Sequence, residues 1–139
     1  MVLFIDTNVA INYLTNRTDE NSAASTKLMA MCGQRKVEGY IASHSIPVIW
    51  YVLRKYPDQD RRIMLRSLCT VLSVVGANQE DIMNALDRED FVDFEDCLQD
   101  ECAQEIDADY IVTCNIRDFG SSIIPAITPT ELLKLIEKE

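Results

Sequence analysis

Carboxylate and amide side chains follow two short apolar runs of the chain. Asp6 comes directly after the run 2–5, and Asn115 and Asp118 come directly after the run 110–114. Both runs lack polar alternation, which is typical of strands buried on both faces. Open α/β sheets bind their ligands just beyond the carboxyl ends of parallel strands. These three side chains therefore stand where a site is expected.

A third acidic pair, Asp93 and Asp96, stands at the start of a predicted helix. If the two strands are neighbours, this pair approaches Asp6 and Asp118, and clustered carboxylates resist ionising together unless a cation lies between them. Oxygen ligands without His or Cys favour Mg²⁺ or Mn²⁺. Such an ion lowers the pKa of a bound water and stabilises charge on a phosphate, so the pattern predicts metal-assisted phosphodiester hydrolysis.

Strands and helices alternate along the chain, which predicts the elements that position these side chains. The predicted strands are 2–5, 39–43, 71–75, 110–114 and a short edge strand at 123–127. Apolar residues at helical spacing predict helices between them and after the last one. The expected fold class is α/β, with a mainly parallel central sheet of four or five strands flanked by helices, in one domain over residues 1–139.

The net charge of −10 argues against a nucleic-acid-binding protein, because phosphate contacts need Lys and Arg. Divalent cations would neutralise part of this charge at the proposed site. Basic residues also gather in the first half of the chain, and the candidates for nucleic-acid binding are Arg54, Lys55, Arg61 and Arg62. These charges are also consistent with a basic partner protein.

The five cysteines form no CxxC pair and mostly occupy apolar positions, so we expect reduced thiols in the core of a cytoplasmic protein. The only histidine is His44, which leaves too few ligands for structural zinc. No apolar run approaches the ~20 residues that span a bilayer, and the first residues lack the basic region of a signal peptide. We therefore expect no membrane association.

Three segments together resemble the PIN-domain nucleases, particularly the PilT N-terminus and VapC-like bacterial proteins. They are FIDTN at 4–8, DFEDCLQDECA at 93–103 and DYIVTCNIRDF at 109–119, and the resemblance continues to ITPTELLKLI near the end. It implies a PIN-like fold and an Mg²⁺- or Mn²⁺-dependent ribonuclease that acts on RNA. It also implies a homodimer and, in many relatives, a toxin with a cognate antitoxin.

The resemblance also assigns roles to individual residues. Asp6, Asp96 and Asp118 fall on the family's metal-binding acidic positions, and Asn115 falls on a polar companion that orients a ligand or water. Asp93 precedes Asp96 in an arrangement common among relatives. We expect it to be a carboxylate near the metal site that contacts the metal ligands.

One family position departs from the pattern. Relatives carry Glu or Asp early in the helix after the second strand, where this chain has Val48. Glu38 and Asp58 lie on either side of that helix and cannot substitute easily. The alternative function is therefore a PIN-like domain with weakened or lost catalysis that binds RNA or a protein.

Simpler interpretations exist for single residues. Asp6 could be a helix N-cap or, with Asn8 in place of a second Asp, part of a haloacid-dehalogenase-like phosphatase site. Glu95 could have no role beyond a favourable interaction of its negative charge with the helix dipole. His44 is expected to be a hydrogen-bonded strand-end residue, and Trp50 is expected to serve packing or an interface.

Overall fold

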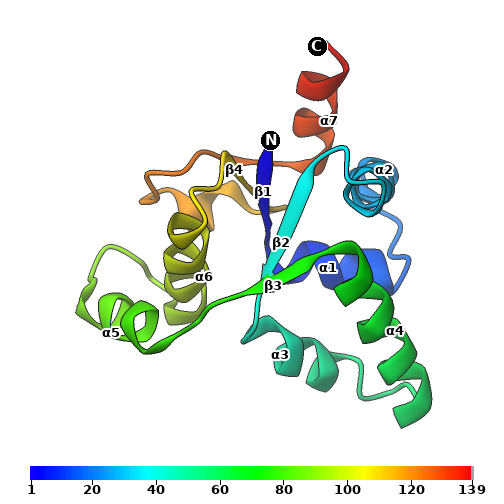
Figure 1. Ribbon diagram of the computed structural model, residues 1–139, viewed down its shortest axis with the longest axis horizontal. Helices are drawn as coiled ribbons and strands as arrows, with labels where there is room; N and C mark the ends of the chain where they lie inside the picture. Colours follow the sequence, from blue (N-terminus) through cyan, green and yellow to red (C-terminus); the bar gives the residue numbers. More distant parts are fainter. Residues whose placement is uncertain (139) are drawn as a thin grey trace.

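One parallel sheet organises residues 1–138, the part of the chain that this computed structural model describes (Figure 1). Its strand order is β3-β2-β1-β4-β5, and every neighbouring pair is parallel. The strands are β1 (Val2–Ile5), β2 (Glu38–Ala42), β3 (Ser73–Val75), β4 (Tyr110–Val112) and β5 (Ala126–Ile127). The predicted fold class is confirmed.

Helices cover both faces of this sheet. They are α1 (Thr7–Leu14), α2 (Ser22–Gly33), α3 (Ser45–Val52), α4 (Asp58–Val71), α5 (Gln79–Asp87), α6 (Phe94–Glu105) and α7 (Pro129–Glu137), with a 3₁₀ turn η1 (Ile116–Phe119). Helices α1, α2 and α4 lie on one side of the sheet, and α5 and α6 lie on the other (Figure 1). None of the described helices is both long and apolar enough to cross a membrane.

The central strand β1 joins the two halves of the core. Leu3 and Ile5 belong to the cluster that includes α1, α2 and α4, whereas Phe4 belongs to the cluster with Cys102 and Phe119. Successive side chains of a strand point to opposite faces, so this short run is apolar throughout. Full burial of each such side chain contributes about 1.5–3 kcal/mol.

Polar caps set where the key helices begin. Asn78 forms a capping box with Asp81 at the start of α5. The side chain of Asp93 accepts a hydrogen bond from the backbone N–H of Asp96, at 3.1 Å, at the start of α6. Each such cap contributes about 1 kcal/mol. The cap on α6 fixes where its first acidic residues stand.

Two details differ from the sequence-based expectation. Strand β4 ends at Val112 and β5 has two residues, so the strands are shorter than predicted. The prediction of core thiols is correct for Cys32, Cys97 and Cys102 but wrong for Cys69 and Cys114, which are exposed. Cys69 lies in α4, where only Leu68 is buried, and Cys114 lies beyond the end of β4.

Candidate metal site

The acidic edge of the sheet lies where the strand order reverses. β1 pairs with β4 in a register that places Ile5 beside Val112, so Asp6 and Thr113 follow at the same level. The backbone N–H of Asp6 donates to the carbonyl of Val112 at 3.0 Å. β2 lies on the opposite side of β1, which makes the gap between β1 and β4 a topological switch point, the usual ligand position of such sheets.

Two side chains from distant elements hold the Asp6 carboxylate, which is 4% exposed. Gln99 Nε2 on α6 donates to Oδ1 at 3.0 Å, and Thr113 Oγ1 donates to Oδ2 at 2.9 Å. Gln99 Oε1 accepts in turn from the backbone N–H of Thr7 at 3.1 Å. Burial raises the pKa of Asp6 above its ordinary value, although these hydrogen bonds oppose the shift.

Asp96 is half-buried at the start of α6, and its charge is poorly compensated. Burial, followed by the negative charges of Asp93, Asp118, Asp6 and Glu95, raises the pKa of Asp96 to about 7. A carboxylate in this state is one that a nearby cation would stabilise strongly. The charges that contribute to this shift come from four other acidic side chains near the same edge of the molecule.

A pocket of about 300 Å³ opens beside these residues. Asp93, Asp96 and Asp118 line it together with Asp90, Phe91, Val92, Arg117, Gly120 and Ser121. Asn115 and Asp118 are exposed on and beside the η1 turn, and the backbone N–H of Asn115 donates to Thr113 Oγ1 at 3.0 Å. The structure thus brings all five predicted site residues to one edge, with Asp6 as the buried member.

These residues fit a divalent ion in donor chemistry and charge. The carboxylates and the amide carbonyl of Asn115 offer oxygen ligands, as Mg²⁺ and Mn²⁺ prefer, and each Asp6 oxygen keeps a lone pair after accepting one side-chain hydrogen bond. Their side chains are too far apart in this structure to bind one ion together: no three His, Cys, Asp or Glu side chains among residues 1–138 lie close enough to hold it. The uncompensated charge at Asp96 is the feature that a cation would relieve.

Sequence reasoning missed the side chains that connect the acidic residues. His44 Nε2 lies 2.7 Å from Glu95 Oε2, and Thr7 Oγ1 lies 2.7 Å from Ser45 Oγ. His44 follows β2, so its place beyond a strand's carboxyl end was a usable signal. The spacing of Glu95 and Gln99, four residues apart on α6, was another, because such residues share a helix face.

Val48 does not occupy the core of the protein. The residue is 38% exposed on α3, and it is absent from the residues that line the acidic pocket. The beginning of α3 instead contributes His44, its N-cap residue, and the buried Ser45 to the edge where the acidic residues lie. Helix α3 contains no Asp or Glu, so Asp6, Asp96, Asp118 and their neighbour Asp93 have no acidic companion from it.

The four basic candidates lie at the corner between α3 and α4, each beside an aromatic ring. Arg61 stacks over Trp50 at 4.1 Å and Arg62 lies 5.4 Å from the same ring. Arg54 lies over Tyr51 at 4.3 Å, and Lys55 lies 5.4 Å from Tyr56. A shallow pocket of about 420 Å³ adjoins Trp50 and Arg62. The structure does not bring these cations to the acidic pocket.

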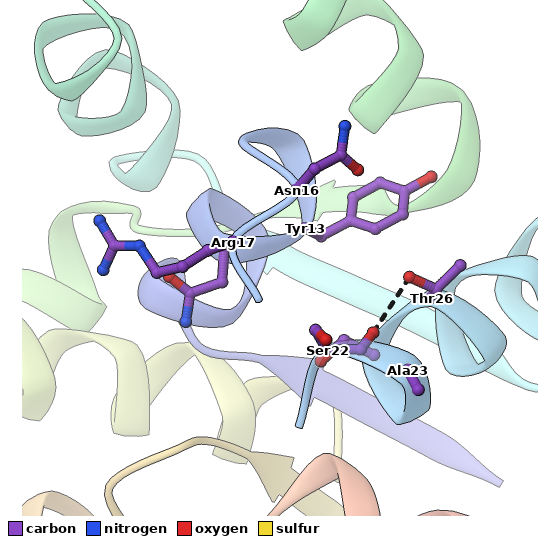
Figure 2. Close-up of a pocket in the computed structure, with 8 residues that line it drawn as sticks. Tyr13, Asn16, Arg17, Ser22, Ala23 and Thr26 are labelled. Atoms are coloured by element: carbon purple, nitrogen blue, oxygen red, sulfur yellow. Dashed lines mark hydrogen bonds between the residues drawn. The ribbon is translucent and has the colours of Figure 1, made fainter. Parts of the chain in front are cut away.

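A separate polar pocket of about 150 Å³ lies between the end of α1 and the start of α2 (Figure 2). Tyr13, Asn16 and Arg17 line it from the end of α1 and the loop that follows, and Ser22 and Thr26 line it from α2, where Thr26 Oγ1 donates to the carbonyl of Ser22 at 3.0 Å. Among residues 1–138, no acidic residue lines this pocket. It therefore lacks the ligands for a metal and is distinct from the acidic edge.

The metal-free protein will lose stability as pH rises from about 4 to about 7. The pKa of Asp96 is about 7 in the folded state against an ordinary value of 3.8, so between these values the folded state keeps a proton that the unfolded state has lost. Urea unfolding at about pH 5 and pH 8 measures the loss. Asp96→Asn should flatten the profile; an unchanged profile would assign the effect to other groups.

The fold and the acidic edge define a class of protein, a small α/β domain with carboxylates gathered at the switch point of a parallel sheet. Residues 2–117 match the PIN domain family, and the chain belongs to that family. The resemblance seen in the three sequence segments is confirmed. Among curated proteins, none matches this sequence.

Solved structures share the fold, and two of them illustrate the likeness. VapBC2 from Rickettsia felis, crystallised bound to a DNA fragment from their promoter, gives a TM-score of 0.71 at 14% identity, covering 92% of this chain and 98% of that one. VapC20 from Mycobacterium tuberculosis, a toxin that cleaves the sarcin–ricin loop, gives a TM-score of 0.58 at 18% identity, covering 78% and 86%. At sequence identities of 14% and 18%, the likeness concerns the fold alone.

Proposed function

We propose that this protein is a divalent-metal-dependent endoribonuclease of the PIN type, with the role of a toxin in a toxin–antitoxin pair. The observation that carries the proposal is the gathering of five acidic side chains at the switch point, where burial and then their negative charges raise the pKa of Asp96 to about 7. Membership of the PIN domain family supports the same conclusion. The test is cleavage of RNA by the purified chain with and without Mn²⁺.

In this proposal, Asp6, Asp96 and Asp118 hold Mg²⁺ or Mn²⁺, and Asp93 supports these ligands from next to the site. When bound, the ion supplies a lowered pKa for an attacking water and charge stabilisation at the phosphate. Thr113 and Gln99 keep the Asp6 carboxylate in place through hydrogen bonds of 2.9 and 3.0 Å. Asn115 is exposed beside the pocket, where its amide can orient a water or a phosphate oxygen.

Metal binding should stabilise the folded protein. At a Mn²⁺ concentration of about 100 times the dissociation constant, the free energy of unfolding rises by about 2.7 kcal/mol. Thermal melts with and without Mn²⁺ measure the gain. Asp96→Asn should reduce it, because one ligand is lost. The absence of any shift at millimolar Mn²⁺ would count against a shared site.

RNA binding should depend on the basic corner of α3 and α4. Charge reversal of Arg54, Lys55 or Arg62 should weaken RNA binding and lower the slope of affinity against salt by about one per lost phosphate contact. Arg61 is a poorer test because it also donates to the carbonyl of Trp50 and packs on that ring. If RNA affinity changes neither with salt concentration nor with these charge reversals, a protein partner would be the better explanation of the basic corner.

The second candidate function is non-enzymatic: a PIN domain that binds RNA or a protein without cleaving it. The observation that favours it is Val48, an exposed apolar residue at the position where the family resemblance implies an acidic one. A cognate antitoxin and a homodimer remain part of the leading proposal, and a basic antitoxin would complement the net charge of −10. Metal-dependent cleavage by the purified chain separates the two functions.

A further inference from the structure

Glu95 shares a hydrogen-bond donor with Asp6. Gln99 Nε2 lies 3.0 Å from Asp6 Oδ1 and 3.0 Å from Glu95 Oε1. The two carboxylate oxygens are therefore separated by at most twice that distance. Gln99 is itself completely buried, and its carbonyl is engaged by the backbone of Thr7. Glu95 thus reaches the Asp6 carboxylate through a rigid amide.

The other Glu95 oxygen is held from across the sheet edge. His44 Nε2 lies 2.7 Å from Glu95 Oε2, and the two residues come from different elements, the N-cap of α3 and the first turn of α6. The side chains of His44 and Glu95 are only 20% and 37% exposed. A glutamate that merely complements a helix dipole has no need of two side-chain partners, since the dipole acts on a solvated charge as well.

We propose that Glu95 supplies the acidic ligand that the family pattern would place in α3, and that His44 is the positioning residue that holds it. The inference rests on the proposed metal-dependent function. Val48 leaves α3 without a carboxylate, while α6 offers one linked to Asp6 through a single amide group.

The hydrogen bonds leave Glu95 able to take this role. Each of its oxygens accepts one hydrogen bond and keeps a lone pair for a cation. A carboxylate linked to a histidine is a common arrangement around protein metal sites, where such partners fix the orientation of the ligand. His44 comes from the start of α3, the helix in which the family resemblance implies an acidic residue.

The test is Mn²⁺ binding to the full chain, measured by calorimetric titration in the absence of RNA. Glu95→Gln keeps the size of the side chain and removes its charge, and it should weaken Mn²⁺ binding roughly tenfold or more. Glu89→Gln is the matched control, because Glu89 is exposed and makes no hydrogen bond among residues 1–138. An equal effect of both changes would reduce Glu95 to a distant charge and overturn the proposal.

His44 is tested by loss and rescue. His44→Ala should weaken Mn²⁺ binding about tenfold, as expected for an outer partner of a metal ligand. His44→Gln retains an N–H donor that can reach Glu95 and should restore most of the affinity. A histidine with a purely structural role would lower the melting temperature and leave Mn²⁺ affinity unchanged, which would overturn the positioning role.

Failure of this inference is distinguishable from failure of the proposed function. If the wild-type chain binds no Mn²⁺, the metal-dependent function fails. If the wild type binds Mn²⁺, Asp96→Asn weakens it and Glu95→Gln does not, only the role of Glu95 fails. Should Glu95→Gln not fold, as judged by circular dichroism, Glu95→Asp takes its place; this change keeps the charge but withdraws the carboxylate, and affinity equal to the wild type would overturn the proposal.

Discussion

Replacement of Arg88 by Met will lower the free energy of unfolding by about 3–5 kcal/mol, because it leaves a buried carboxylate without its cation. Asp100 on α6 is completely buried, and Arg88 Nη1 lies 2.7 Å from its Oδ2. The same guanidinium also binds Glu101 at 3.1 Å and Asp90 at 3.0 Å. The hydrogen bonds that the guanidinium donates to Asp90, and then to Asp100 and Glu101, raise the pKa of Arg88 above its ordinary value.

The remaining partner of Asp100 cannot replace the arginine. Gln104 Nε2 donates to Asp100 Oδ2 at 2.9 Å, and Asp100 Oδ1 has no hydrogen-bond partner among residues 1–138. A buried charge with one neutral donor is costly. Adding Asp100→Asn to Arg88→Met should therefore recover part of the lost stability, because it removes the unpaired charge.

Urea unfolding measures the effect, and Arg62→Met is the matched control. Arg62 lies 2.8 Å from Asp58, but the two side chains are 70% and 56% exposed. An exposed pair of this kind contributes at most about 1 kcal/mol. If Arg88→Met costs no more than this control, water reaches Asp100 when the arginine is absent, and the ion pair is not the main support of α6.

Asp6→Asn will abolish metal-dependent cleavage while leaving the protein folded. The amide has the shape of the carboxylate, so its oxygen can still accept from Gln99 Nε2 and its NH₂ can donate to Thr113 Oγ1. The lost charge is the one that the metal requires. We expect cleavage of RNA to fall about a hundredfold or more, since even outer partners of metal ligands cost ten- to a hundredfold.

Thermal melts provide the second measurement on Asp6→Asn. Burial and the charge of Glu95 both disfavour the ionised form of Asp6, and Asp6 in turn raises the pKa of Asp96. Removing the charge should leave the melting temperature of the metal-free protein unchanged or higher, as is common where a functional site is strained by like charges. Full cleavage activity in Asp6→Asn would contradict the proposed site, and a large loss of stability would contradict the assigned electrostatics.

Local sequence patterns were enough to predict the fold class and the edge at which the acidic residues gather. Short apolar runs alternate with helical spacing, so the parallel sheet follows from periodicity and the short connections between elements. Asp6 and Asn115 end two such runs, and parallel strands bring their carboxyl ends to one edge. The caps at Asn78 and Asp93 are equally local, since each bond joins residues three apart.

Only the tertiary structure decided which side chains hold the acidic residues. The bonds from Gln99 and Thr113 to Asp6 join residues 93 and 107 positions apart, and the bond between His44 and Glu95 joins residues 51 positions apart. Periodicity within a segment determines which face of a helix or strand is apolar, but it carries no information on the register between distant elements. The partners of Asp6 and Glu95 therefore became visible only when the strands and α6 were placed side by side.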